Sequence, residues 1–370
     1  MKTVYYFTNV FPHYRKPIWE LLVNENKYDF NIFYSKKKLN GIESIDNKSK
    51  SLKNLHLINN YFFFGRLIWQ TRVIRTIIKN DFDIAIFMGE MNVLSNWIGA
   101  VICRILNKKV FFWGHGLYGN ENFGKKYIRI LFLKLADINI LYENRSMNLM
   151  IKAGFDKSQM KVIFNSLNYD LQLKLFNELE LSSEKGMSQF KNNLKTIIFV
   201  GRLTKMKNIK LLINTVNLIN TESPRVNLLI VGDGPEKLDL EKYAKRHLSS
   251  KTFKFIGSIY DEKKLSKYFY ASSLTVSPGN IGLTAIHSLS YGTPVASHDN
   301  LKNQMPEVES IIDGDNGFLF KENDQKDLAH KLLCWILKKE PKKRVVRKII
   351  DEKYNQYFQK KIMDELILDL

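Results

Sequence analysis

Short runs of β-branched and aromatic residues alternate with longer amphipathic segments along most of this chain, and this alternation is the feature that most constrains its fold. Strands separated by helix-length segments predict a parallel sheet covered by helices. The pattern stops in a polar stretch from about Gln172 to Lys195 and then restarts. We therefore expect two α/β units, which agrees with a length of 370 residues and a hydrophobic content of 45%.

Five buried runs in the first half predict strands, and four amphipathic segments predict the helices between them. The strands are expected at Thr3–Phe7, Asp29–Tyr34, Ile84–Met88, Lys109–Trp113 and Ile138–Tyr142. The helices are expected at Pro17–Val23, Leu67–Lys79, Asn92–Leu106 and Lys125–Leu135. In the second half, strands are expected at Thr196–Val200, Val226–Val231, Phe253–Ile256, Leu274–Ser277 and Pro294–Ser297.

These elements predict a first domain over residues 1–170, a linker over 171–195 and a second domain over 196–350. A last helix over 351–370 could pack back on the first domain. Both domains are expected to be doubly wound, and two such domains usually bind ligands in the cleft between the carboxyl ends of their strands.

The chain is strongly basic, with a formal charge of +20 from 57 Lys and Arg against 37 Asp and Glu. This balance favours a polyanionic partner such as nucleic acid, an anionic lipid surface or a phosphorylated substrate. Nothing resembles a recognition helix, a zinc finger or an RNA-binding aromatic signature, so we expect no nucleic acid partner. Because Cys103 and Cys334 are the only cysteines, a disulfide framework or zinc site is not expected.

No secretory signal is visible at the N-terminus, and the longest apolar runs fall short of the roughly 20 residues that a spanning helix needs. A chain with two cysteines in apolar patterns also fits a reducing compartment. We therefore expect a cytoplasmic protein that is soluble or bound peripherally to a membrane.

Two strand ends in the second half carry candidate chemistry. Arg202 and Lys207 follow the strand that ends at Gly201, and two cations at such a point suit a diphosphate. Two solvated cations in a loop that binds no ligand would give the same sequence pattern. The segment 277–284 (Ser-Pro-Gly-Asn-Ile-Gly-Leu-Thr) leads into a predicted helix, whose N-terminal N–H groups favour a phosphate. The glycines of this segment could also be present only because the turn requires positive φ angles.

Several segments of the second half together resemble one family, the retaining glycosyltransferases of family 4 (glycosyl transferases group 1), which have the GT-B fold of two facing Rossmann-like domains. The order and spacing of these segments are those of the family's C-terminal domain. They are Gly201-Arg202-Leu203 with Lys207, the segments 229–235, 255–257, 276–278, 282–283 and 291–295, and Asn316-Gly317-Phe318-Leu319.

The resemblance implies that Arg202 and Lys207 neutralise the diphosphate of a nucleotide-sugar donor and stabilise the leaving nucleotide without a metal ion or cofactor. It implies that the segment ending at Gly257 borders the base. The expected donor-binding residues are Gly201, Gly257, Gly279, Asn280, Gly282, Leu283, Thr284 and His287.

The chain departs from the family pattern at two positions. The family commonly has two Glu separated by seven residues, and the matching positions here are Gly279 and His287. Sugar choice and ribose contacts therefore cannot be transferred from the resemblance. His287 could bond a ribose hydroxyl through one ring nitrogen, or it could be a helix-face residue bonded to a neighbouring carbonyl.

The first half offers three candidate residues. His115 lies between two glycines at the end of a buried strand and resembles the Trp-Gly-His-Gly segment of some family members, where the histidine faces the donor sugar. A lone histidine can also be structural. Arg15 and His13 lie in the first strand-to-helix turn, where an acceptor phosphate could bind.

Membrane contact is predicted from a basic amphipathic helix at Arg66–Lys79, which follows the aromatic run Tyr61–Phe64. Such a helix could equally pack on its own sheet. Residues 1–170 hold 25 Lys and Arg against 13 Asp and Glu, so the first domain carries most of the excess charge. This placement suits a lipid-linked acceptor at the inner face of a bacterial plasma membrane.

Together these features predict transfer of a sugar from a nucleotide sugar to a lipid-linked or oligosaccharide acceptor in surface polysaccharide synthesis. Two alternatives remain open. A non-hydrolysing sugar-nucleotide 2-epimerase should show catalytic carboxylates lining the cleft, and no such set is identified. A non-catalytic sugar-nucleotide-binding protein is compatible with the missing Glu pair, but it would have less need of Arg202 and Lys207.

Overall fold

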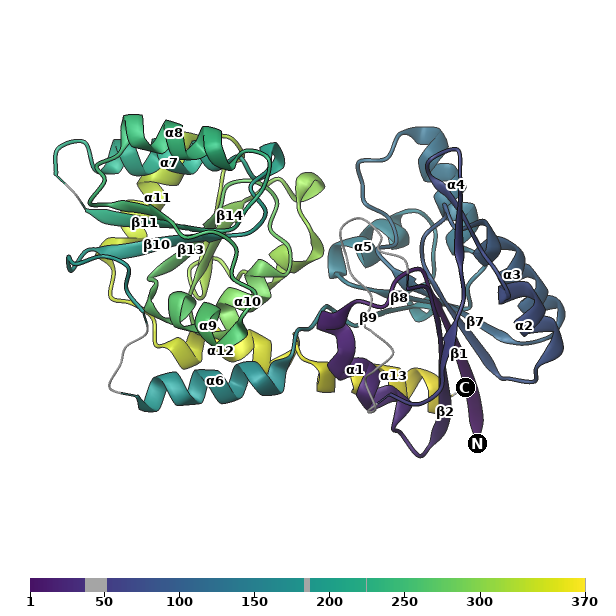
Figure 1. The fold of residues 1–370 in the computed structure, drawn as a ribbon. Helices are drawn as coiled ribbons and strands as arrows, with labels where there is room; N and C mark the ends of the chain where they lie inside the picture. The colour runs from purple at the N-terminus through teal and green to yellow at the C-terminus, as the bar shows by residue number, and fades with distance from the viewer. Residues whose placement is uncertain (37–51, 183–186, 224, 370) are drawn as a thin grey trace. The chain divides into compact units, whose positions relative to one another are not determined.

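A computed structural model of the chain describes residues 1–36, 52–182, 187–223 and 225–369. The structure contains two compact units (Figure 1). The first consists of Met1–Asn168 together with Asn355–Leu370, and the second consists of Tyr169–Tyr354. Each unit is built on a parallel sheet, which confirms the predicted α/β class. In the described residues no helix is long and apolar enough to span a bilayer.

The sheet of the first unit has seven strands in the order β3-β2-β1-β6-β7-β8-β9, and all neighbours are parallel. The strands are β1 (Lys2–Thr8), β2 (Tyr28–Tyr34), β3 (Leu55–Leu57), β6 (Ile84–Met88), β7 (Lys109–Gly114), β8 (Ile138–Leu141) and β9 (Met160–Val162). The five strands predicted for this half are confirmed. The edge strands β3 and β9 were not predicted, because three residues are too few to show a period.

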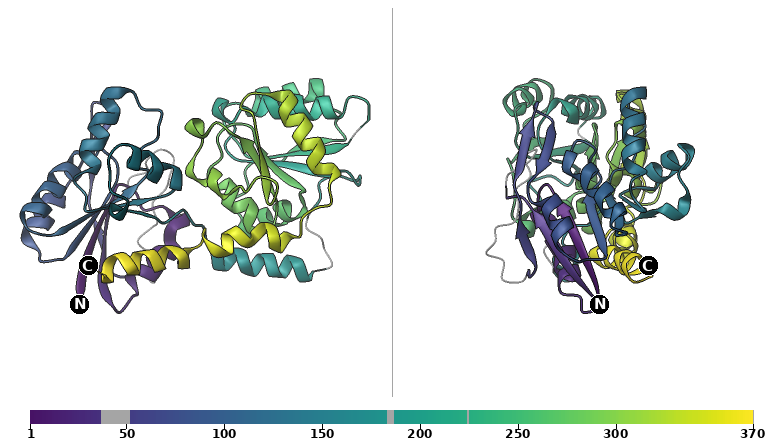
Figure 2. Two further views of the ribbon diagram at one scale, coloured as in Figure 1. Left: turned by 180° about the vertical axis from the view of Figure 1, so that it is seen from behind. Right: turned by 90° about the vertical axis from the view of Figure 1, so that its right-hand side faces the viewer.

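Helices cover both faces of this sheet, which is why its central strands are apolar on both sides (Figures 1 and 2). On one face, Trp19 and Ile367 pack into the core with Val4. On the other face, Ile77 and Phe132 are part of a second core cluster. The helices are α1 (Lys16–Val23), α2 (Val73–Lys79), α3 (Leu94–Ile105), α4 (Phe123–Leu133), α5 (Asn144–Lys152) and α13 (Gln356–Leu368).

The prediction of one helix over Leu67–Lys79 is wrong in its first half. The strands β4 (Asn60–Phe63) and β5 (Leu67–Gln70) form an antiparallel hairpin, and α2 begins only at Val73. Phe64 and Gly65 in its turn have φ values of 47° and 68°, the left-handed conformation of tight hairpin turns. Within β5, Ile68 and Gln70 are buried and their neighbours are less so, which is the two-residue period of a strand.

The second unit contains six parallel strands in the order β12-β11-β10-β13-β14-β15. They are β10 (Lys195–Val200), β11 (Val226–Val231), β12 (Phe253–Phe255), β13 (Leu274–Ser277), β14 (Val295–His298) and β15 (Gly317–Phe320). The five strands predicted here are confirmed. The helices are α6 (Tyr169–Leu181), α7 (Ile209–Ile219), α8 (Lys237–His247), α9 (Glu262–Ala271), α10 (Thr284–Ser290), α11 (Gln325–Leu337) and α12 (Lys343–Glu352).

The predicted linker over residues 171–195 is wrong for the helical part of that range. Helix α6 belongs to the second unit, where it packs on α9 and α10. Its apolar face is formed by Leu175, Phe176 and Leu179, which recur at helical spacing among polar residues. Near the C-terminus, α12 ends at Glu352 within the second unit, and α13 lies in the first.

The position of α13 in the core of the first unit can be tested with Met363, which has no exposed surface. Met363→Ala should lower the free energy of unfolding by about 2–5 kcal/mol, because it leaves a cavity in the core. Leu368→Ala, at a residue that is 39% exposed, should change it by less than about 0.5 kcal/mol. Urea denaturation followed by tryptophan fluorescence reports on this core through Trp19 and Trp113. Equal effects of the two substitutions would contradict this packing.

Candidate active site

Two loops of the second unit meet at the carboxyl ends of neighbouring strands. The first loop, Gly201–Asn208, follows β10, and the second, Pro278–Leu283, follows β13. Strands β10 and β13 pair in parallel, so the two loops leave the sheet side by side. Ligands of open α/β sheets bind at this edge.

The two loops are joined by direct contacts. Lys207 donates hydrogen bonds from Nζ to the carbonyl oxygen of Asn280 at 2.6 Å and to its Oδ1 at 2.8 Å. The backbone N–H of Gly279 donates to the carbonyl oxygen of Lys207 at 3.0 Å. A Cβ at Gly279 would lie 1.9 Å from the carbonyl oxygen of Met206. Close packing between the loops, rather than room for a ligand, therefore accounts for glycine at position 279.

The two predicted cations differ in their environment. Arg202 is exposed, and its guanidinium has no hydrogen bond or ion pair to any residue that the structure describes. Burial lowers the pKa of Lys207, and the carboxylate of Glu307 opposes this shift. Glu307 is buried in a 3₁₀ turn, Pro306–Ser310, and was not predicted from the sequence. The site therefore combines a half-buried lysine, which the carboxylate of Glu307 influences, with one exposed arginine.

The second loop leaves backbone donors available where it enters α10. Among the described residues, the N–H groups of Gly282 and Leu283 have no hydrogen-bond acceptor. A Cβ at Gly282 would meet only Glu307 and Met305, each at 3.8 Å, so space remains beside this backbone. The hydroxyl of Thr284 donates to the carbonyl oxygen of Val200 at 3.3 Å. Exposed N–H groups at a helix start can bind an anion.

A half-buried side chain that the sequence did not identify holds the second loop in place. Gln304 accepts a hydrogen bond at Oε1 from the N–H of Ile281 at 2.8 Å. Its Nε2 donates to Ser297 Oγ and to the carbonyl oxygen of His298, both at 2.9 Å. Ser297 in turn donates to the carbonyl oxygen of Gly279 at 3.3 Å. No sequence signal marks Gln304, because it lies 23 residues from its partner Ile281.

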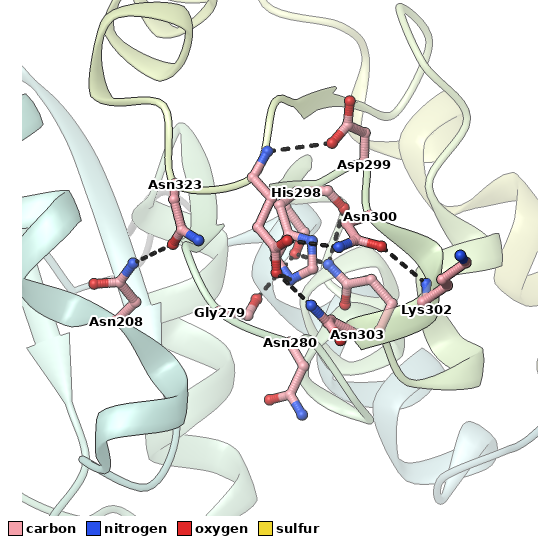
Figure 3. A network of polar contacts seen from close by, with 12 residues as sticks. Asn208, Gly279, Asn280, His298, Asp299, Asn300, Lys302, Asn303 and Asn323 are labelled. Atoms are coloured by element: carbon pink, nitrogen blue, oxygen red, sulfur yellow. Dashed lines mark hydrogen bonds and ion pairs between the residues drawn. The ribbon is translucent and has the colours of Figure 1, made fainter. Parts of the chain in front are cut away.

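A polar network next to this support fixes the segment after β14 (Figure 3). The carboxylate of Glu322 accepts hydrogen bonds from Asn300 Nδ2 at 2.6 Å and from Asn303 Nδ2 at 2.9 Å. Asn208, at the end of the first loop, donates to Asn323 Oδ1 at 3.0 Å. The first loop is thus tied to the segment that follows β15, and the second loop to the segment that follows β14.

His287 lies one turn into α10, and its partner is a carboxylate rather than a carbonyl group. Its Nε2 lies 2.8 Å from Glu262 Oε1, which also accepts from Tyr291 at 2.5 Å and from Gln172 at 3.2 Å. Burial raises the pKa of Glu262, but these hydrogen bonds outweigh burial and lower it to about 2. The Nε2 atom of His287 is therefore engaged, and a ribose contact would have to use Nδ1.

In the first unit, Arg15 and His115 lie near the same tyrosine. The guanidinium of Arg15 stacks over Tyr142, with 4.8 Å to the ring centroid, and donates to Asn165 Oδ1 at 2.8 Å. The ring of His115 contacts Tyr142 edge-on at 5.0 Å. Burial, with Arg15 nearby, lowers the pKa of His115 to about 4, so this imidazole is neutral at pH 7. His13 is exposed and outside this cluster.

A carboxyl group near this cluster was not predicted. Glu90 follows β6, next to the strand that ends before His115, and burial raises its pKa although Arg129 and Lys125 oppose the shift. Its only sequence signal is its place just after a buried strand.

Gly257, the expected base neighbour, has φ 74° and open space beside its Cα. Within the described ranges, no three His, Cys, Asp or Glu residues are grouped to hold a metal ion.

The Glu262 cluster predicts a pH dependence of stability. The pKa of the Glu262 carboxyl is lower in the folded than in the unfolded chain. The carboxylate therefore stabilises the folded chain above about pH 4.5, and this stabilisation is lost as the pH falls toward 2. Protonation of this carboxyl should lower the free energy of unfolding of the wild type by up to about 3 kcal/mol between pH 5 and pH 2. Glu262→Gln should lack this part of the decrease. Urea denaturation across this range measures the effect, with exposed Asp239→Asn as the control. A wild-type pH profile in Glu262→Gln would contradict the assignment.

The sequence of the chain is similar to those of several known proteins. Residues 182–352 match the family described as glycosyl transferases group 1. An uncharacterised 41.2 kDa protein in the cps region of Klebsiella pneumoniae is 27% identical over 290 residues, which are 72% of this chain and 75% of that protein. An uncharacterised glycosyltransferase of Methanocaldococcus jannaschii is 25% identical over 280 residues, which are 71% of this chain and 68% of that protein.

Two solved structures share the fold over the whole length of both chains. HepE of Anabaena in complex with UDP is 17% identical with a TM-score of 0.71. The lipopolysaccharide outer core galactosyltransferase WaaB is 15% identical with a TM-score of 0.73. Together with the family match over most of the second unit, these likenesses show a GT-B fold. The chain is therefore a glycosyltransferase with the GT-B fold, and residues 182–352 of its second unit match the family glycosyl transferases group 1.

Proposed function

We propose that this glycosyltransferase moves a sugar from a nucleoside diphosphate sugar to a lipid-linked or oligosaccharide acceptor during the synthesis of a bacterial surface polysaccharide. The observation that carries the donor class is the pair of joined loops in the second unit. They present the exposed side chain of Arg202, the half-buried ammonium of Lys207 and the unpaired N–H groups of Gly282 and Leu283 at one sheet edge. Such groups suit a diphosphate, which carries negative charge and many acceptor oxygens.

The same groups would assist the reaction itself. When the bond between the sugar and the diphosphate breaks, negative charge grows on the departing nucleotide. Donors that are already oriented stabilise that charge without reorganisation. Lys207 is oriented by Asn280 before any ligand binds, whereas Arg202 has freedom to approach the phosphates. Retention of the anomeric configuration is proposed from the family resemblance alone.

The acceptor and the pathway are proposed from the relatives and from charge. One relative is a protein in a cps region, and one structural neighbour acts on the lipopolysaccharide outer core, as their names state. In the first unit, the neutral imidazole of His115 and the guanidinium of Arg15 lie at the carboxyl ends of the strands. We propose that they contact the donor sugar and an acceptor phosphate, at the inner face of the plasma membrane.

The donor site is tested by a matched pair of substitutions in the first loop. Arg202→Ala should lower kcat by roughly 10²–10³-fold, the scale for losing one charge-stabilising donor. Lys205→Ala removes an exposed cation three residues away and should leave kcat within about twofold, because a surface substitution away from the reacting groups has little effect. Transfer is measured with the donor that raises the melting temperature most among UDP-, GDP- and dTDP-sugars. Near-normal kcat in Arg202→Ala would refute the proposed role.

The charge arrangement also predicts transfer without a metal ion. We propose that Arg202 and Lys207 neutralise the diphosphate in place of a divalent cation. Turnover should therefore change by less than about twofold when the enzyme is treated with a chelator and assayed in metal-free buffer. Loss of activity with chelator, and its return on adding Mn²⁺ or Mg²⁺, would show that the two side chains are not sufficient.

A further inference from the structure

The helices on one face of the first unit carry charge of a single sign. Helices α2, α3 and α4 contain no Asp or Glu. Helices α1 and α13, on the opposite face of the sheet, contain Glu20, Asp364 and Glu365. Figure 1 shows the two groups on opposite sides of the sheet. The basic residues of the first group are Arg75, Lys79, Arg104, Lys125, Lys126 and Arg129.

The same helices expose large apolar side chains. On α3, Ile98, Val101 and Ile105 recur at a spacing of three and four residues and form a stripe opposite the buried residues of that helix. On α4, exposed Phe123 and Tyr127 are likewise separated by one turn. Ile105 is 73% exposed and Phe123 is 88% exposed, values far above those of a core residue. We call these five residues the α3–α4 face.

The two helices are held together as one surface. Trp97 of α3 packs on Phe132 of α4 with 4.9 Å between ring centroids. Arg104 donates hydrogen bonds to the carbonyl oxygens of Lys134 and Leu135, just after α4, at 3.4 and 3.1 Å. Both helices cover the same side of the sheet, so their outer stripes point away from it on that side.

The β4–β5 hairpin adds an aromatic tip beside the start of α3. Phe63 is 46% exposed and Phe64 is 96% exposed. The N–H of Ile68 donates to the carbonyl oxygen of Asn92 at 2.9 Å, and Asn92 Nδ2 donates to the carbonyl oxygen of Arg66 at 3.0 Å. The hairpin is thus attached to the residues that precede α3.

We propose that the α3–α4 face docks on an anionic lipid surface, with the hairpin tip inserting at the membrane interface. Exposed apolar and aromatic side chains on helices that carry cations and no Asp or Glu match a bilayer whose headgroups are negative and whose interior is apolar. A second copy of the chain is disfavoured, because pairing α3 and α4 with the same helices of another copy would bring their cations together, and these helices contain no Asp or Glu. The proposal deepens the membrane location given under the proposed function, but it uses none of the donor-site residues.

The test uses the full chain and vesicles of phosphatidylcholine, with or without phosphatidylglycerol. The protein should co-sediment only with the anionic vesicles, and salt should release it. Ile105→Ser with Tyr127→Ser, and separately Lys125→Gln with Lys126→Gln, should each lower the bound fraction at least about fivefold. Phe63→Ser with Phe64→Ser should lower it as well. The control pair, Leu368→Ser with Lys361→Gln, lies on α13 and should bind like the wild type.

The proposal is overturned if the α3–α4 variants bind anionic vesicles as well as the wild type does, or if neutral vesicles bind equally. It is also overturned if light scattering shows a dimer that these variants convert to monomer while vesicle binding is unchanged. Thermal stabilisation by nucleotide sugars is measured in every variant and should be retained, which excludes misfolding. If no nucleotide sugar stabilises the wild type but vesicle binding follows the predicted pattern, the donor assignment fails and the docking surface stands.

Discussion

The hydrogen bonds from Lys207 to Asn280 join two loops that lie more than 70 residues apart in the sequence. The rest of the candidate site depends on that junction. These hydrogen bonds fix the half-buried ammonium of Lys207 on the same loop that carries the unpaired N–H groups of Gly282 and Leu283. Glycine at 279 lets the loops approach closely, because any side chain there would collide with Met206. Without this contact the cations and the backbone donors would be separate features, and they would not form one anion-binding edge.

The junction is supported by polar side chains from the segments after β14 and β15. Gln304 holds the N–H of Ile281, and Glu322 holds two asparagines of the neighbouring segment. Polar groups that bond to each other in this way favour a single loop conformation, since each broken bond removes stabilising free energy. A preorganised edge is what stabilisation of a leaving diphosphate requires, because the donors must already be in place when the charge develops.

The strands were predictable because each is a short apolar run bounded by turns. The loops that carry Arg202, Lys207 and Asn280 were predictable because they follow such strands. The helix predicted over Leu67–Lys79 was wrong in its first half because Leu67 of the hairpin fits the same helical period as Ile74 and Ile78 of α2. The left-handed turn at Phe64 and Gly65 carries no proline or asparagine signal. Gln304, Glu262 and Glu307 could not be predicted as site residues. Their partners are distant in sequence, and only the fold brings them together.

The joined loops of the second unit are proposed to bind the diphosphate of a nucleotide sugar. Amide hydrogen exchange with and without the stabilising nucleotide sugar tests it directly, since binding protects the N–H groups that it engages. Peptides covering residues 201–208 and 278–286 should gain protection, and Arg202→Ala should reduce that gain at the same ligand concentration. Protection confined to the first unit, or unchanged exchange at both loops under saturating ligand, would contradict the account.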